Sequence, residues 1–304
     1  MDNLTCEGIK KTYGEKEVLH GIDLTIEKHK IYGMIGRNGA GKTTLLSILS
    51  AQATATKGTV SVNGMPVWEN RKALDCICFS REISTGIGNG SIGAVKVKDY
   101  LKAAAIYYPN WDQEMAEQLL EKFQLDKKQK LGKVSKGMLS MVTIIIALAS
   151  KSEYTFLDEP VAGLDVIMRE YFYKLLLEEY EKTDRTFLIS THIIEEAANI
   201  FEDILIIKDG KLIINENTQD LIDRAVYISG KKEDVDQATK GFVCHHEEIN
   251  GRSKGVTVLL DAKEGQSQFS NWSKKGQSLF SDFDVCVQSV SLQNLFVALC
   301  GMGE

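Results

Sequence analysis

The sequence predicts an α/β protein with a mixed, largely parallel sheet covered by helices, followed by a smaller α+β module. Two observations predict this class. Short apolar segments typical of buried strands alternate with helical patterns over residues 1–225, which implies a parallel sheet covered on both faces. Beyond about residue 225 the pattern changes to short, closely spaced strands. The 304 residues suffice for one large or two modest domains, so we expect units at 1–225 and 226–304.

The N-terminal segment is expected to form strands interrupted by one helix. Ile22, Leu24 and Ile26 alternate with polar residues, as in a half-buried strand. Asn63-Gly64 is a strong hairpin-turn signal at the end of a β-branched run. The expected elements are strands at 22–26, Ile31–Ile35, Thr59–Val62 and Leu74–Phe79, and a helix from Gly41 to Ser50.

A helical insertion is expected over about residues 85–149, between two sheet-forming halves. Apolar residues recur at helical spacing from Val97 to Tyr108, from Asp112 to Phe123 and from Met138 to Ala149. Asp112 is a suitable residue to cap the second of these helices. The sheet then resumes with strands at Tyr154–Leu157 and Thr186–Ser190, helices at Val166–Glu181 and up to Ala198, and a hairpin around Asp209-Gly210.

The last 79 residues suggest the order β-α-β-β-α-β, that of a ferredoxin-like module, closed by one more helix. The expected strands are 226–229, 242–249, 255–260 and 283–290, and the expected helices 233–239, 265–275 and 291–299. The net charge of this part is −2 and that of the chain −6, so no nucleic-acid partner is expected.

No apolar run approaches the roughly 18 residues that a membrane-spanning helix needs. The longest, Met141–Ala149, has nine residues, and the N-terminus lacks the pattern of a secretory signal. We therefore expect a cytoplasmic protein that does not cross a bilayer itself. Cys76 and Cys78 are expected to be core residues, and Cys244-His245-His246 lacks a second ligand cluster for zinc.

The segment from Gly36 to Thr43 fits the phosphate-loop pattern G-x-x-x-x-G-K-[ST], between an expected strand and an expected helix. Glycines let backbone N–H groups wrap phosphates, and the helix directs its positive end at them. Lys42 is expected to reach the β- and γ-phosphates, and the Thr43 hydroxyl to ligate Mg²⁺. The expected nucleotide-binding residues of the loop are Gly36, Arg37, Asn38, Gly39, Ala40, Gly41, Lys42, Thr43 and Thr44.

Asp158 and Glu159 end the apolar strand that begins at Tyr154. An acid in this place can hold Mg²⁺, and a second acid can orient or deprotonate an attacking water. We therefore expect Asp158 to be a metal ligand and Glu159 to be the general base. Together with the phosphate loop, this pair is far more specific than acids at a strand end would be alone.

With these motifs, residues 1 to about 225 resemble the ATP-binding cassette (ABC) ATPases, a branch of the P-loop NTPase fold. Val134-Ser135-Lys136-Gly137-Met138 resembles the ABC signature, and Ala162-Gly163-Leu164-Asp165 resembles the D-loop. His192 matches the switch histidine, and Tyr13 the aromatic residue that stacks on adenine. The resemblance implies a head-to-tail dimer, in which Ser135, Gly137 and Asp165 complete the site of the partner copy's ATP.

Two motifs depart from the family pattern. The signature keeps Ser135 and Gly137 but has Val, Lys and Met at its other three positions. The usual Q-loop glutamine aligns with Glu82, whose carboxylate can still ligate Mg²⁺ but cannot donate a hydrogen bond as an amide does. Because of these departures, the coupling to a partner and the hydrolysis rate are open questions.

The resemblance implies an ATP-hydrolysing subunit that uses ATP and Mg²⁺ and works with separate integral-membrane permease subunits. The Ser291–Phe296 segment resembles the closing helix of exporter-type subunits for antibiotics or peptides, so export of a drug, peptide or similar amphiphile is expected. The partner cassette is either an identical chain or a paralogue, and the protein would lie at the cytoplasmic face of the membrane. The alternatives are a soluble ABC ATPase and a nucleotide-sensing regulatory subunit, neither of them coupled to transport.

Overall fold

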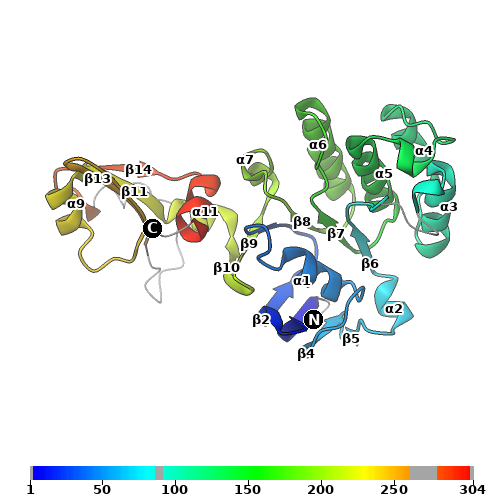
Figure 1. Cartoon of the computed structure of the whole chain (residues 1–304), viewed down its shortest axis with the longest axis horizontal. Helices are drawn as coiled ribbons and strands as arrows, with labels where there is room; N and C mark the ends of the chain where they lie inside the picture. The colour runs from blue at the N-terminus through cyan, green and yellow to red at the C-terminus, as the bar shows by residue number, and fades with distance from the viewer. Residues whose placement is uncertain (1–2, 86–91, 261–278, 302–304) are drawn as a thin grey trace.

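The structure is a computed structural model, which describes residues 3–85, 92–260 and 279–301. Its described strands form three sheets, two in the N-terminal part and one in the C-terminal module (Figure 1). The first is antiparallel, with the strand order β2-β1-β4-β5. Its strands are β1 Leu4–Tyr13, β2 Lys16–Ile26, β4 Lys57–Val62 and β5 Met65–Pro66.

The second sheet carries the candidate site and has the order β10-β9-β3-β8-β7-β6. Its strands are β3 Ile31–Ile35, β6 Ile77–Ser80, β7 Tyr154–Asp158, β8 Thr186–Ser190, β9 Asp203–Lys208 and β10 Lys211–Asn217. Five strands run parallel, and β10 pairs antiparallel with β9. Every residue of β3, β6, β7 and β8 is buried, as expected for parallel strands covered on both faces.

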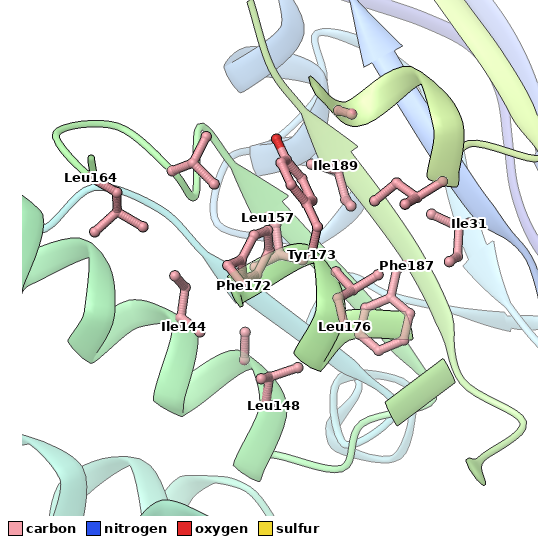
Figure 2. Packing of buried hydrophobic residues seen from close by; sticks show 14 of the residues in the cluster. Ile31, Ile144, Leu148, Leu157, Leu164, Phe172, Tyr173, Leu176, Phe187 and Ile189 are labelled. Carbon is pink, nitrogen blue, oxygen red and sulfur yellow. The ribbon is translucent and has the colours of Figure 1, made fainter. Parts of the chain in front are cut away.

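Two apolar cores flank this sheet. Helix α1 (Lys42–Leu49) fills one face, where Leu45 and Leu49 are fully buried between the two N-terminal sheets. Helices α5 (Lys136–Ala149) and α6 (Val166–Lys182) pack on the other face. Figure 2 shows Leu176 of α6 beside Phe187 of the sheet and Phe172 of α6 beside Leu157. The parallel strands are therefore held rigidly from both sides, which fixes the positions of their ends.

The helical region lies at one side of the sheet (Figure 1). Its helices are α3 Val97–Tyr107, α4 Gln113–Lys122 and α5, with short 3₁₀ turns at Ile92–Ala94 and Leu131–Lys133. Asp112 caps α4, as expected, by accepting a hydrogen bond from the Met115 N–H at 2.9 Å. Helix α5 begins at Lys136, two residues before the expected Met138, because Ser135 provides its N-cap.

One strand prediction is wrong at its start. Leu74 ends a helical turn, α2 (Arg71–Leu74), and the strand β6 begins only at Ile77. Asn70 caps this turn by accepting from the Ala73 N–H, so the apolar run belongs to two elements. Cys76 consequently lies outside the strand and only Cys78 inside it.

The C-terminal sheet is antiparallel and has the order β12-β13-β11-β14. Its strands are β11 Ala225–Lys231, β12 Cys244–Asn250, β13 Ser253–Leu259 and β14 Val285–Ser289. The first and third strands of the module are central and the second and fourth lie at the edges, which is the ferredoxin-like order. Helix α9 (Lys232–Ala238) covers one face with Val235 and Ala238. The expected helix at 265–275 lies outside the described residues.

The last helix, α11 (Leu292–Cys300), packs against the N-terminal part rather than within the core of the module. Leu295 and Leu299 join the same apolar cluster as Leu221 and Ile206. The short helices α7 (Ile194–Ala197) and α8 (Thr218–Asp223) and a 3₁₀ turn at Ala198–Ile200 complete the fold. Within the described ranges, no helix is both long enough and apolar enough to span a membrane.

Candidate nucleotide-binding site

The phosphate loop lies between the C-terminal end of β3 and the start of α1, as the sequence predicts. Gly39 and Gly41 have φ angles of 82° and 109°, in the region that favours glycine. A Cβ atom on Gly36 would lie 2.5 Å from the Ile207 carbonyl oxygen, so this position also requires glycine. The loop can therefore curl tightly enough to direct its N–H groups at an anion at the N-terminus of α1.

Lys42 is only 7% exposed, and its side chain extends back to the first residue of the phosphate loop. Its Nζ donates to the Gly36 carbonyl oxygen at 2.6 Å, which ties the helix to the first residue of the loop. Burial lowers the pKa of Lys42, while the charges of Glu159 and Asp158 oppose that shift. An entering phosphate would give the Lys42 ammonium group a directly bound anionic partner in this buried place.

Asp158 joins the loop to two strands through two short hydrogen bonds. Its Oδ2 accepts from the Thr43 hydroxyl and its Oδ1 from the Ser190 hydroxyl, both at 2.6 Å. Asp158 and Ser190 lie opposite each other in the parallel pairing of β7 and β8. The hydroxyl and carboxylate oxygens are hard donors of the kind that Mg²⁺ prefers, so this trio fits the ion.

Glu159 follows β7 with a φ of 51°, an uncommon conformation for a residue other than glycine. Its N–H donates to the Ser190 carbonyl oxygen at 2.9 Å, which holds this turn against β8. The Glu159 Oε2 lies 2.6 Å from His192 Nδ1, so the expected general base and the expected switch histidine contact each other. The carboxylate remains 26% exposed and can still reach a water molecule.

Ser135 caps α5 by accepting from the Met138 N–H at 3.2 Å. Gly137 lies directly against the D-loop, because a Cβ there would be 2.5 Å from the Gly163 carbonyl oxygen. Asp165 accepts from the Met168 N–H at 2.9 Å and thus caps α6. The expected signature and D-loop therefore form one packed unit.

The other residues expected to bind the nucleotide differ in how far they are exposed. Tyr13 ends β1 with its side chain 52% exposed, and Lys11 Nζ lies 4.7 Å from the centre of its ring. Arg37, Asn38 and Gly39 are exposed, Thr44 is partly buried, and Ala40 is buried where its carbonyl oxygen accepts from Gly210 N.

Glu82, expected as a third Mg²⁺ ligand, forms an ion pair with Lys136 at 3.2 Å. Its described contacts do not bring it to the Thr43–Asp158 pair. In the described ranges, His, Cys, Asp and Glu side chains nowhere gather in threes to form a metal-binding cluster. A metal at Asp158 would therefore depend on phosphate oxygens and water for its remaining ligands.

Ser190 is a residue of the site that the sequence did not predict. Ser190 was expected only as the last residue of a strand, whereas its hydroxyl orients the Asp158 carboxylate. The position of Ser190 in the sequence indicates this role, because a hydroxyl residue at the end of the neighbouring parallel strand lies beside the acid that ends β7.

Fold and site together define a class: a nucleotide-binding α/β domain with a phosphate loop, an acidic strand end and a separate helical region. A family model described as "ABC transporter" matches residues 19–162. The chain is 31% identical over 220 residues to the bacitracin transport ATP-binding protein BcrA of Enterococcus faecalis, which covers 72% of this chain and 70% of that protein. It is 30% identical over 224 residues to the Nod factor export ATP-binding protein I of Burkholderia orbicola, covering 72% of each.

Solved structures share the fold. One described as the ATP-binding subunit of an ABC transporter has a TM-score of 0.63 at 22% identity, covering 72% of this chain and 91% of that one. The dimeric cassette MJ0796, bound to ADP and Pi, has a TM-score of 0.62 at 23% identity, covering 71% and 98%. The chain belongs to the ABC transporter ATP-binding proteins, as its motifs indicated.

Proposed function

We propose that this chain binds ATP with Mg²⁺, hydrolyses it as a head-to-tail dimer, and thereby powers a separate integral-membrane permease. The observation that carries the proposal is the convergence of three contacts at one end of the sheet. Lys42 crosses the phosphate loop, Thr43 bonds to Asp158, and Glu159 contacts His192. This arrangement provides a phosphate cradle, a metal site and a base within one small region.

The roles of the residues follow from their contacts. The loop N–H groups and Lys42 would bind the β- and γ-phosphates, and Tyr13 would stack on the adenine ring. Thr43 and Asp158 would hold Mg²⁺, which neutralises phosphate charge when bound. Ser135, Gly137 and Asp165 would face the ATP held by the partner copy, where the N-terminus of α5 favours an anion.

Hydrolysis would use Glu159 as the base. A water oxygen attacks the γ-phosphorus, the bond from that phosphorus to the bridging oxygen breaks, and the water proton passes to Glu159. The 2.6 Å contact with His192 Nδ1 holds the Glu159 carboxylate in place. His192 is 60% exposed, so its ring can also turn toward a γ-phosphate.

The cargo is proposed from the relatives. Proteins named for bacitracin, lantibiotic and Nod factor transport are among those that the chain resembles. We therefore propose export of a drug, peptide or similar amphiphile, with the chain at the cytoplasmic face of the membrane, bound to its permease. The second cassette of the dimer is either an identical chain or a paralogue.

The test is Glu159→Gln in the full chain. Loss of the base should lower ATP turnover by about 10²- to 10⁴-fold and trap an ATP-bound dimer, since binding is left intact. Phosphate release and sedimentation measure the two effects, and Glu195→Gln, an exposed acid on α7, is the control. Unchanged turnover in Glu159→Gln would refute the assignment of the base. A wild-type chain that binds ATP but never hydrolyses it, even with a permease, would favour the nucleotide-sensor alternative.

A further inference from the structure

Two of the positions at which this sequence departs from the ABC pattern contact each other, one in the signature and one at the Q-loop. Lys136 Nζ, in the signature, lies 3.2 Å from Glu82 Oε1, in the segment that follows β6. The lysine of the signature and the glutamate at the place of the Q-loop glutamine thus form an ion pair. This suggests that the two replacements act together.

Lys136 occupies an unusual place for a lysine. It is the first residue of α5, where the positive end of the helix dipole disfavours a cation. The Glu82 carboxylate offsets this unfavourable charge. A residue that is unfavourable at its position in a helix, and whose charge is compensated by a neighbouring residue, is expected to serve a function.

The stem of Lys136 is packed against the D-loop, while the side chain as a whole remains exposed. The Cγ of Lys136 packs against Gly163 of the D-loop so closely that a Cβ on that glycine would lie 3.0 Å away. The side chains of Lys136 and Glu82 are nevertheless 56% and 60% exposed, and an ion pair this exposed is weak. A polyphosphate, with more charge and strong acceptor oxygens, can displace the carboxylate.

We propose that Lys136 is an additional phosphate-binding residue, with Glu82 as its counter-ion in the open state. When two copies close, Lys136 Nζ leaves Glu82 and binds the γ-phosphate of the ATP held by the phosphate loop of the second copy. This inference rests on the proposed ATP-dependent dimer. Closure of the dimer then frees Glu82, which lies in the segment that joins β6 to the helical region. ATP binding is thereby coupled to that region.

The test compares dimerisation of the full-length wild type with three variants, Lys136→Gln, Lys136→Arg and Glu82→Gln. Gln and Arg keep the Cβ and Cγ that pack against Gly163, so the packing with the D-loop is retained. Lys133→Gln, an exposed lysine three residues away, is the matched control. The probe is Mg²⁺ with a non-hydrolysable ATP analogue, and sedimentation velocity gives the dimer dissociation constant.

Lys136→Gln should weaken analogue-driven dimerisation by about tenfold or more, the effect of losing a charge-assisted hydrogen bond. Lys136→Arg should stay within about threefold of wild type because it keeps the charge. Glu82→Gln should strengthen dimerisation by about two- to fivefold, since Lys136 is released from its competitor. This gain should shrink as salt rises, because exposed charges are screened.

Three results would overturn the inference. The Lys136→Gln variant could dimerise as tightly as the wild type, or Glu82→Gln could weaken dimerisation as much as Lys136→Gln does. The third result is a wild type that binds the nucleotide but does not dimerise. Analogue binding to dilute monomer separates this inference from the proposed function. The monomer uses its own phosphate loop, so Lys136→Gln should bind the analogue as wild type does. A wild-type monomer that binds no nucleotide would overturn the proposed function itself, and this inference with it.

Discussion

Arg185 is a buried cation whose removal should destabilise the whole N-terminal part. It is only 4% exposed and lies between helix α5 and strand β8. Burial lowers the pKa of Arg185, and the buried Glu179 carboxylate opposes that shift from 3.0 Å. Four further hydrogen bonds, at 2.7 to 2.9 Å, go to the carbonyl oxygens of Ala147, Leu148 and Ser152 and to the Thr155 hydroxyl, and a longer one, at 3.5 Å, to the Ser150 hydroxyl. Arg185 thus joins the end of the signature helix to the central sheet.

The perturbation is Arg185→Met, which keeps much of the volume and removes the charge. Losing one partner of a buried ion pair costs about 3–5 kcal/mol of unfolding free energy. Glu179 would keep Lys151 Nζ at 2.8 Å, so its charge would not be left alone. Three carbonyl groups would lose a charged donor, however, which adds to the loss. We expect a net destabilisation of about 3 kcal/mol.

Urea unfolding followed by far-UV circular dichroism measures this effect through the midpoint and slope of the transition. The control is Arg169→Met, since Arg169 forms a more exposed ion pair with Glu196 at 2.9 Å. That variant should lose less than about 1 kcal/mol. The double variant Arg185→Met/Glu179→Met should lose less than the sum of its single variants, because each single variant breaks the same Arg185–Glu179 ion pair and the sum counts that loss twice. A loss for Arg185→Met no larger than that for Arg169→Met would refute this reasoning.

Two further substitutions test the site itself. Ser190→Ala removes the hydroxyl that donates to Asp158 at 2.6 Å, so the apparent Mg²⁺ affinity in ATP hydrolysis should fall by about 10- to 100-fold. A Mg²⁺ titration of turnover that matches wild type would contradict that role. Gly137→Ala places a Cβ 2.5 Å from the Gly163 carbonyl oxygen, which must move the signature away from the D-loop. Turnover should fall by about tenfold or more while the monomer still binds nucleotide, and an unchanged rate would show that this packing is dispensable.

The phosphate loop, the strand end at Asp158 and the helical region follow from the sequence because each is specified locally. Each of them depends on a short sequence pattern. These patterns are the spacing of glycines, an apolar run that ends in two acids, and residues suited to cap a helix. The parallel pairing of β7 and β8 confirms the expected sheet, and it brings Glu159 and His192 together although 33 residues separate them along the chain.

What the sequence did not predict depends on contacts between distant segments. The side chain of Glu82 can serve as a metal ligand or as an ion-pair partner, and only the fold brings it to Lys136. The turn of α2 was missed because its apolar residue, Leu74, continues directly into the pattern of the next strand. In both cases the local pattern fits two structures, and tertiary packing decides between them.

The last helix of the chain is connected to the phosphate loop through one hairpin. Lys208 Nζ, at the end of β9, donates to the Leu299 carbonyl oxygen at 2.7 Å and so neutralises the negative end of α11. Two residues later, Gly210 N donates to the Ala40 carbonyl oxygen at 3.1 Å, inside the loop. Removing the C-terminal residues would therefore expose the apolar surface under α11 and free the hairpin that supports the loop. An ATPase defect after such a deletion follows from lost support alone, so a regulatory role of the ferredoxin-like sheet must be tested with α11 kept in place.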